Sequence, residues 1–183
     1  DATVHTTSID IGAQLARNEL HLALNGRGAH AECKGLFLAD QKRHIDSRIT
    51  VDHAAPDTTS RERFRGVLAD QARGVFNGRI HVLSEAQKTS AELTNRNLLL
   101  NPGAEVNAKP ELEIYADDVK CAHGSTTGQL DQNSLFYLLS RGIDQEEARV
   151  LLIRAFVGEL LTDISVPEVR DITQEALARL GTK

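Results

Sequence analysis

The chain has 183 residues, of which 40% are hydrophobic and 26% are charged, a composition that excludes a disordered segment and fits a globular protein. Lysine and arginine together number 21 against 26 Asp and Glu, and the net charge of -5 argues against a nucleic-acid partner held through its phosphates. The longest aliphatic run, residues 150–153, is far shorter than the roughly 20 apolar residues of a membrane span, so no membrane partner is expected.

Cysteine is rare in this sequence, with Cys33 and Cys121 as its only two examples. Two thiols are too few for a disulfide framework and are typical of a reducing compartment, which predicts a cytoplasmic location. The chain begins at Asp1 with neither a start methionine nor an apolar leader. We therefore expect it to be a fragment of a longer protein.

Residues 1–129 contain short segments in which apolar and polar residues alternate, as in 20–24 and 80–82. A spacing of two places such side chains on one face of a strand. Between the segments, Asn25-Gly26, Asn77-Gly78 and Asn101-Pro102-Gly103 are interpreted as turns, because Asn and Gly tolerate positive φ.

From residue 37 onward the apolar segments recur about every 15 residues, which favours the stacked coils of a β-solenoid, although a β-sandwich also has short, regularly spaced strands. A solenoid coil buries its inner face only against its neighbours. Its open ends must be capped or paired, so a truncated solenoid is expected to seek a partner, including a second copy of itself.

The pattern changes to helices in residues 130–183. Asp131 is predicted to cap a first helix that ends at Gly142, and Asp144 with Glu147 forms a reciprocal cap for a second. A third helix is predicted to begin at Pro167. The expected buried positions of the second helix are Ala148, Leu151, Leu152, Ala155, Phe156, Val157, Leu160 and Leu161, and those of the third are Val169, Ile172, Ala176, Leu177 and Leu180. We thus predict a mainly β protein with α-helices, divided into a β core at 1–129 and a helical region at 130–183.

Cys121 and His123 are the candidate metal ligands of this sequence. On an extended strand both side chains point to one face, while Ala122 points to the other. Thiolate and imidazole suit iron, zinc and copper rather than magnesium or calcium. The alternative is a packed cysteine beside a histidine that bonds a backbone carbonyl, since free cysteine is among the most buried residues.

Two ligands do not complete a tetrahedral metal site, which needs about four. Asp117, Asp118 or a second chain could supply the remainder, whereas Cys33 lies several strands away in sequence. If the pair binds metal, we expect a half-site completed across an interface, or a transient one.

Other motifs are weaker. Arg61, Arg63 and Arg65 share a strand face and indicate either an anion site or, as we favour for an acidic chain, a solvated face balanced by acids. Gly26-x-Gly28 precedes no helix and is not a dinucleotide motif. A glycan-cleaving enzyme using Asp117 and Asp118 beside Lys120 is disfavoured, because adjacent strand residues face opposite ways. No catalytic or cofactor-binding residue is predicted, and the chain is not expected to be an enzyme.

The stretch KPELEIYADDVKCAHGSTTGQLDQNSLFYLLSRGI, residues 109–143, resembles the signature of the SufB/SufD family of iron-sulfur cluster assembly proteins. SRERFRGVLADQARGVFNGRIHVL and AQKTSAELTNRNLLL extend the resemblance upstream, and EEARVLLIRAF extends it downstream, so that it covers about residues 40–163. DDVKCAHG resembles the SufD branch rather than the SufB branch. Asn95 stands where the SufB branch has a functional cysteine, so the resemblance does not make this chain alone a scaffold for a whole cluster.

The resemblance implies a right-handed parallel β-helix followed by a helical region, with the amino-terminal helical part of a full-length protein missing. It implies a complex in which this chain pairs with a SufB-like subunit through the β-helices and docks a SufC-like ATPase through its helices. His123 is implied at the SufB/SufD interface, with Cys121 beside it as a metal, sulfur-relay or packing residue. An iron-sulfur cluster shared transiently with the partner is the expected cargo, and no nucleotide is expected in this chain. The alternative is a purely structural dimerisation platform.

Overall fold

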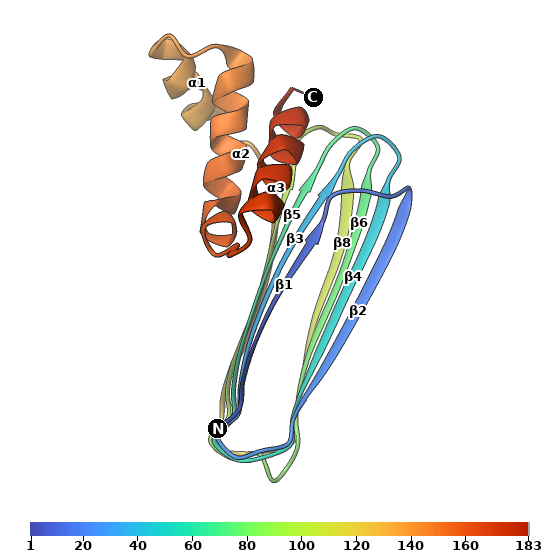
Figure 1. Cartoon of the computed structure of the whole chain (residues 1–183), viewed down its shortest axis with the longest axis vertical. Helices are drawn as coiled ribbons and strands as arrows, with labels where there is room; N and C mark the ends of the chain where they lie inside the picture. Colours follow the sequence, from blue (N-terminus) through green and yellow to red (C-terminus); the bar gives the residue numbers. More distant parts are fainter. Residues whose placement is uncertain (183) are drawn as a thin grey trace.

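The computed structural model describes residues 1–182, which form nine β-strands followed by three α-helices (Figure 1). The strands are β1 (Thr3–Asp10), β2 (Leu15–Leu24), β3 (His30–Ala39), β4 (His44–His53), β5 (Thr59–Leu68), β6 (Arg73–Val82), β7 (Ser90–Leu99), β8 (Glu105–Ile114) and β9 (Lys120–Gln129). The helices are α1 (Gln132–Ser140), α2 (Gln145–Thr162) and α3 (Pro167–Gly181). None of the helices formed by residues 1–182 is long and apolar enough to cross a membrane.

The strands form two parallel sheets, because each strand pairs with the strand two places along the chain. The first sheet has the order β1-β3-β5-β7-β9, and the second has the order β2-β4-β6-β8. The chain alternates between the sheets and so winds in flattened coils, each with one strand in either sheet (Figure 1). The predicted parallel β-solenoid with C-terminal helices is confirmed, and the sandwich alternative is wrong.

The turns are only partly those that the sequence predicts. Asn25-Gly26 and Asn101-Pro102-Gly103 lie between strands, as expected. Asn77-Gly78 does not form a turn, because both residues lie in the middle of β6. Gly78 is buried there, and a Cβ at that position would overlap the side chains of Phe76 and Leu93. This glycine therefore makes room for its neighbours rather than reversing the chain.

Side chains of successive coils stack inside the solenoid in register. Val51, Ile80 and Leu112 form one such column on the second sheet. Val51 and Ile80 are fully buried, whereas Leu112 on β8 is only half-buried. Burial decreases along the column because no strand of the described chain covers the last coil. The solenoid interior is consequently open at its β8/β9 end.

The predicted caps of the first two helices hold, with one difference. The Asp131 carboxylate accepts hydrogen bonds from the backbone N–H groups of Asn133 and Ser134, and Gly142 has the positive φ of 84° expected after a helix end. Asp144 accepts a bond from the Glu147 N–H. The return bond from the Glu147 side chain is not formed within the described part of the chain, so this cap is one-sided.

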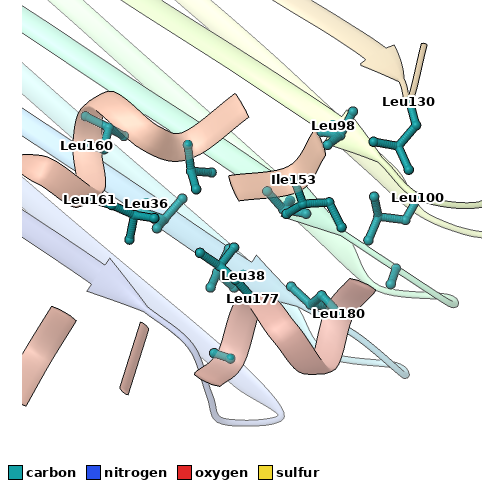
Figure 2. Close-up of a cluster of buried hydrophobic side chains, with 14 of the residues drawn as sticks. Leu36, Leu38, Leu98, Leu100, Leu130, Ile153, Leu160, Leu161, Leu177 and Leu180 are labelled. Carbon is teal, nitrogen blue, oxygen red and sulfur yellow. The ribbon is translucent and has the colours of Figure 1, made fainter. Parts of the chain in front are cut away.

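Helices α2 and α3 pack on the outward face of the first sheet, near the ends of its strands (Figure 1). Figure 2 shows Leu36 and Leu38 of β3 among side chains of both helices, including Ile153 and Leu177. Burial of each such side chain stabilises the fold by about 1.5–3 kcal/mol. The helices and the strands therefore share one hydrophobic cluster, and the division into two domains remains a prediction.

The predicted helix faces are partly wrong. Leu151 and Ala155 of α2 are exposed, while Ile153, which the sequence pattern omitted, is fully buried. On α3, Val169 and Ile172 are exposed. The reason is that the sheet offers only a narrow apolar strip between charged residues, so each helix buries fewer positions than its apolar stripe contains.

Candidate functional site

Strand β9 holds Cys121 and His123 on the face that points into the solenoid. The two residues are in register with Ala91 and Leu93 of β7, which are buried in the interior. Because side chains alternate along a strand, Cys121 and His123 share this inward direction and Ala122 points outward. The structure therefore places Cys121 and His123 on one face of the strand, as the sequence predicts.

The pair is nevertheless not sealed in the core. Cys121 is half-buried and packs at the margin of an interior hydrophobic cluster, while His123 is exposed. Both are accessible because β9 is the edge strand of its sheet and begins an incomplete coil. An interior position at the uncovered end allows a second molecule to reach both groups.

The two thiols of the chain differ in their surroundings. Burial raises the pKa of the Cys33 thiol to about 11, with Thr6 opposing this and the negative charges of Glu62 and Glu32 adding to it. Burial also raises the pKa of the Cys121 thiol. A hydrogen bond with the Ala91 backbone opposes this rise, and the negative charge of Glu62 adds to it. Both cysteines are free thiols, and β5 and β7 separate their strands.

The inward row of β9 continues beyond the pair with Ser125 and Thr127. Ser125 donates a hydrogen bond to Asn95 Oδ1 at 3.2 Å, and Asn97 Nδ2 donates to the same oxygen at 2.6 Å. Both asparagines are buried. Sequence analysis did not single out Ser125 and Thr127, although the period of two that relates Cys121 to His123 also includes them. One wall of the open end is therefore polar along its whole length.

Glu62 is the other unexpected feature of the interior. It is fully buried, and its neighbours in register are Cys33 and Leu93. Within residues 1–182 neither of its carboxylate oxygens has a hydrogen-bond partner of good geometry. Burial raises the pKa of Glu62 to about 7; Ser60 opposes the shift and the charge of Glu92 adds to it. The alternation in SRERFR could have revealed Glu62, because an outward Arg61 and Arg63 place the residue between them inside.

The candidate pair supplies two donors, and the described chain adds no others. Within residues 1–182 no group of three or more His, Cys, Asp or Glu side chains is arranged to hold a metal ion. Asp117 and Asp118 are exposed in the connection before β9. The thiol and imidazole can therefore act as part of a larger ligand set for a soft or borderline metal, completed from outside.

The arginines of β5 lie outward, where the sequence placed them, and all three pair with acids, Arg61 with Glu92 at 3.7 Å. Arg63 Nη2 lies 2.7 Å from Glu32 Oε1 and also pairs with Glu159 of α2. Arg65 Nη2 lies 3.1 Å from Glu159 Oε2 and its guanidinium stacks 5.4 Å from the Phe156 ring centroid. The predicted balance by acids is confirmed. Helix α2 covers Arg63 and Arg65, however, so this face of the strand is not simply solvated.

Comparison with known proteins matches the chain to one family. The sequence profile described as SUF system FeS cluster assembly, SufBD core domain, covers residues 1–156. The chain is 39% identical to the iron-sulfur cluster assembly protein SufD of Escherichia coli over 100% of its own length and 43% of that protein. It is 38% identical to an iron-sulfur cluster assembly SufBD family protein of Mycobacterium leprae, over 93% of this chain and 46% of the relative.

A relative from the cyanobacterium Synechocystis, also described as an iron-sulfur cluster assembly SufBD family protein, is 36% identical over 88% of this chain and 36% of its own length. The chain thus spans less than half the length of these curated relatives. The family profile covers most of the chain, including every strand and the site on β9. The chain belongs to the SufB/SufD family of iron-sulfur cluster assembly proteins and is a homologue of SufD.

Proposed function

We propose that the chain is a non-catalytic, SufD-type subunit that pairs with a SufB-like subunit and presents Cys121 and His123 at the shared interface. The observation that carries this proposal is the position of the pair, which is inward-facing but uncovered at the open end of the solenoid. The iron-sulfur cluster is cargo, held transiently between the two subunits. The partner supplies the ligands that this chain lacks.

The edge of β9 supports pairing with another strand. On a parallel strand, alternate backbone N–H and C=O groups point to each side, and among the described residues β9 has a strand neighbour on only one side. Unpaired edges of this kind bind strands of other chains. In the complete complex the SufB-like subunit covers this edge, and in its absence a second copy of the chain does so.

The half-buried Cys121 suits a transient role. Metal binding requires the thiolate, so capture of iron by Cys121 releases a proton from a thiol whose pKa burial has raised. His123, being exposed, contributes a borderline nitrogen donor beside it. Such a half-site holds metal weakly alone and firmly when a partner completes it.

Helices α1 and α2 expose large apolar side chains, which suits contact with a second partner. Phe136 is 72% exposed and Tyr137 is 57% exposed on α1, with Leu139 and Leu151 near 40%. Exposed apolar surface of sufficient extent marks interaction sites. We assign these side chains to contact with a SufC-like ATPase. In this proposal the ATPase hydrolyses the nucleotide and the chain itself binds none. The complex works in the cytoplasm.

The test is anaerobic reconstitution of the complex with its SufB-like and SufC-like partners, followed by measurement of iron and sulfide per complex. His123→Ala is expected to lower both contents several-fold without preventing assembly, and Cys121→Ser is expected to lower them less. His5→Ala is the matched control, because His5 is exposed on β1 at the opposite edge of the same sheet.

Three outcomes separate the alternatives. Unchanged iron and sulfide in both β9 variants, with the complex intact, would make the chain a structural platform without cluster contact. Failure of the wild-type chain to bind a SufB-like subunit would remove the proposed partner. An equal loss in the His5→Ala control would show that the assay responds to any lost histidine.

A further inference from the structure

A small pocket on the outward face of the first sheet is lined by four arginines, of which Arg63 is also paired with Glu32 outside the pocket. Its volume is about 260 Å³, and it lies between β5, β7 and helix α2. Four arginines and two glutamates supply all of its charged lining: Arg61, Arg63, Arg65, Arg96, Glu92 and Glu159. The pocket faces away from Cys121 and His123, so it is separate from the site on β9.

The acids of the pocket are already engaged. Glu159 is shared, since it pairs with both Arg63 and Arg65. Glu92 lies 3.7 Å from Arg61 Nε, a distance longer than a hydrogen bond, and both side chains are more than half exposed. No carboxylate of the pocket remains for a fourth guanidinium.

Arg96 is that fourth guanidinium. It is in register with Arg65 on the adjacent strand, on the same outward face, and it is exposed. Within residues 1–182 it forms no ion pair and no hydrogen bond through its side chain. Like charges in register on neighbouring strands repel each other. Burial lowers the pKa of Arg65, and although Glu159 opposes this, the charges of Arg96 and Arg63 lower it further.

We propose that the pocket binds a small dianionic oxyanion, a phosphate-type group held between Arg65 and Arg96. Guanidinium groups donate paired N–H bonds with the geometry that phosphoryl oxygens accept. The bound anion offsets the unpaired charge of Arg96 and reduces the repulsion between Arg65 and Arg96. The hydroxyl of Thr94, which also lines the pocket, is a further donor.

The experiment is isothermal titration of the chain with inorganic phosphate and with phenyl phosphate, at constant ionic strength kept with chloride. Arg96→Gln removes the unpaired charge without breaking an ion pair, so the variant should fold normally. Loss of a charged hydrogen-bond donor should weaken phosphate binding by about tenfold or more. Arg73→Gln is the matched control, because Arg73 is exposed at the start of β6 on the other sheet; its effect should stay within about twofold.

Saturable binding that Arg96→Gln weakens and Arg73→Gln leaves intact supports the site. Tighter binding of phenyl phosphate would then indicate the phosphoryl group of a larger molecule, and equal or weaker binding would indicate the free ion. The proposal is overturned if no saturation occurs up to about 20 mM phosphate, at which a ligand with a Kd of about 1 mM would occupy about 95% of the sites. It is also overturned if both variants bind alike, or if a glutamate-rich peptide binds and phosphate does not.

Discussion

The buried carboxyl of Glu62 makes the stability of this protein depend on pH in a direction opposite to that of a salt-bridged acid. The pKa of Glu62 is about 7 in the folded chain, against 4.5 for an unperturbed glutamate, and burial is the main cause. The folded state therefore binds its proton more tightly than the unfolded state. Its contribution to stability is fully present below pH 4.5 and is lost as the pH rises from 4.5 to 7.

The size of this loss follows from the difference of about 2.5 between the two pKa values. At about 1.4 kcal/mol for each pKa unit, ionisation of Glu62 costs about 3 kcal/mol of unfolding free energy at pH 8. Glu62→Gln has nearly the same shape and cannot ionise. We expect this variant to exceed the wild type in stability by up to about 3 kcal/mol at pH 8, and the difference to shrink to near zero by pH 4.5.

Urea unfolding between pH 4.5 and pH 8.5 measures this difference directly. Glu19→Gln is the matched control: Glu19 is an exposed glutamate on β2 of the other sheet, and its substitution should change stability by less than about 0.5 kcal/mol at any pH. The decisive quantity is how the difference in unfolding free energy between the wild type and Glu62→Gln changes with pH. A difference that is the same at every pH reflects only the packing of the amide. A difference between wild type and Glu62→Gln that does not vary with pH would refute the account of the interior.

The remaining predictions test other parts of the fold. Burial lowers the pKa of His53 to about 4, against the opposing charge of Asp52, so the contribution of His53 to stability should fall by about 3 kcal/mol as the pH drops from 6.5 to 4. The difference in urea unfolding free energy between the wild type and His53→Asn should change by this amount over that range. Gly66→Ala places a Cβ against Phe37 and Asn97 and should cost about 2 kcal/mol by thermal or urea unfolding, whereas Gly128→Ala, with open space around it, should cost little. Leu177→Ala empties a fully buried position of α3 and should lower the unfolding free energy by about 3 kcal/mol. Ile172 is 51% exposed, so Ile172→Ala should lower it by less than about 0.5 kcal/mol. Equal losses would mean that the assigned buried face of α3 is wrong.

The sequence predicts much of this fold because its signals are local. Alternation of apolar residues marks the strands, and Asp131, Gly142 and Asp144 mark helix ends through hydrogen bonds or φ values that involve neighbours in the chain. The common face of Cys121 and His123 is local in the same sense, since it depends only on the period of an extended strand.

The parts that sequence reasoning missed depend on contacts between distant residues. Asn77-Gly78 has the composition of a turn, but both residues lie inside a strand. A glycine is needed at position 78 because the side chains of Phe76 and Leu93 leave no room for a Cβ. The pairing of Arg63 with Glu159 joins residues 96 positions apart. Exposure of Leu151 and Ile172 depends on the width of the apolar strip on the sheet, which no helix periodicity records. Likewise, the uncovered state of His123 depends on which strand is last in its sheet.

The central claim, that a SufB-like subunit pairs with the free edge of β9, is tested most directly by amide hydrogen exchange of this chain, diluted until its own copies no longer pair, with and without that partner. We predict strong added protection in residues 120–129, concentrated at alternate amides that point to the free side, and no change in β2 at the other end of the second sheet. Formation of a stable complex with unchanged exchange across β9 would contradict the claim, because Cys121 and His123 would then lie away from the interface.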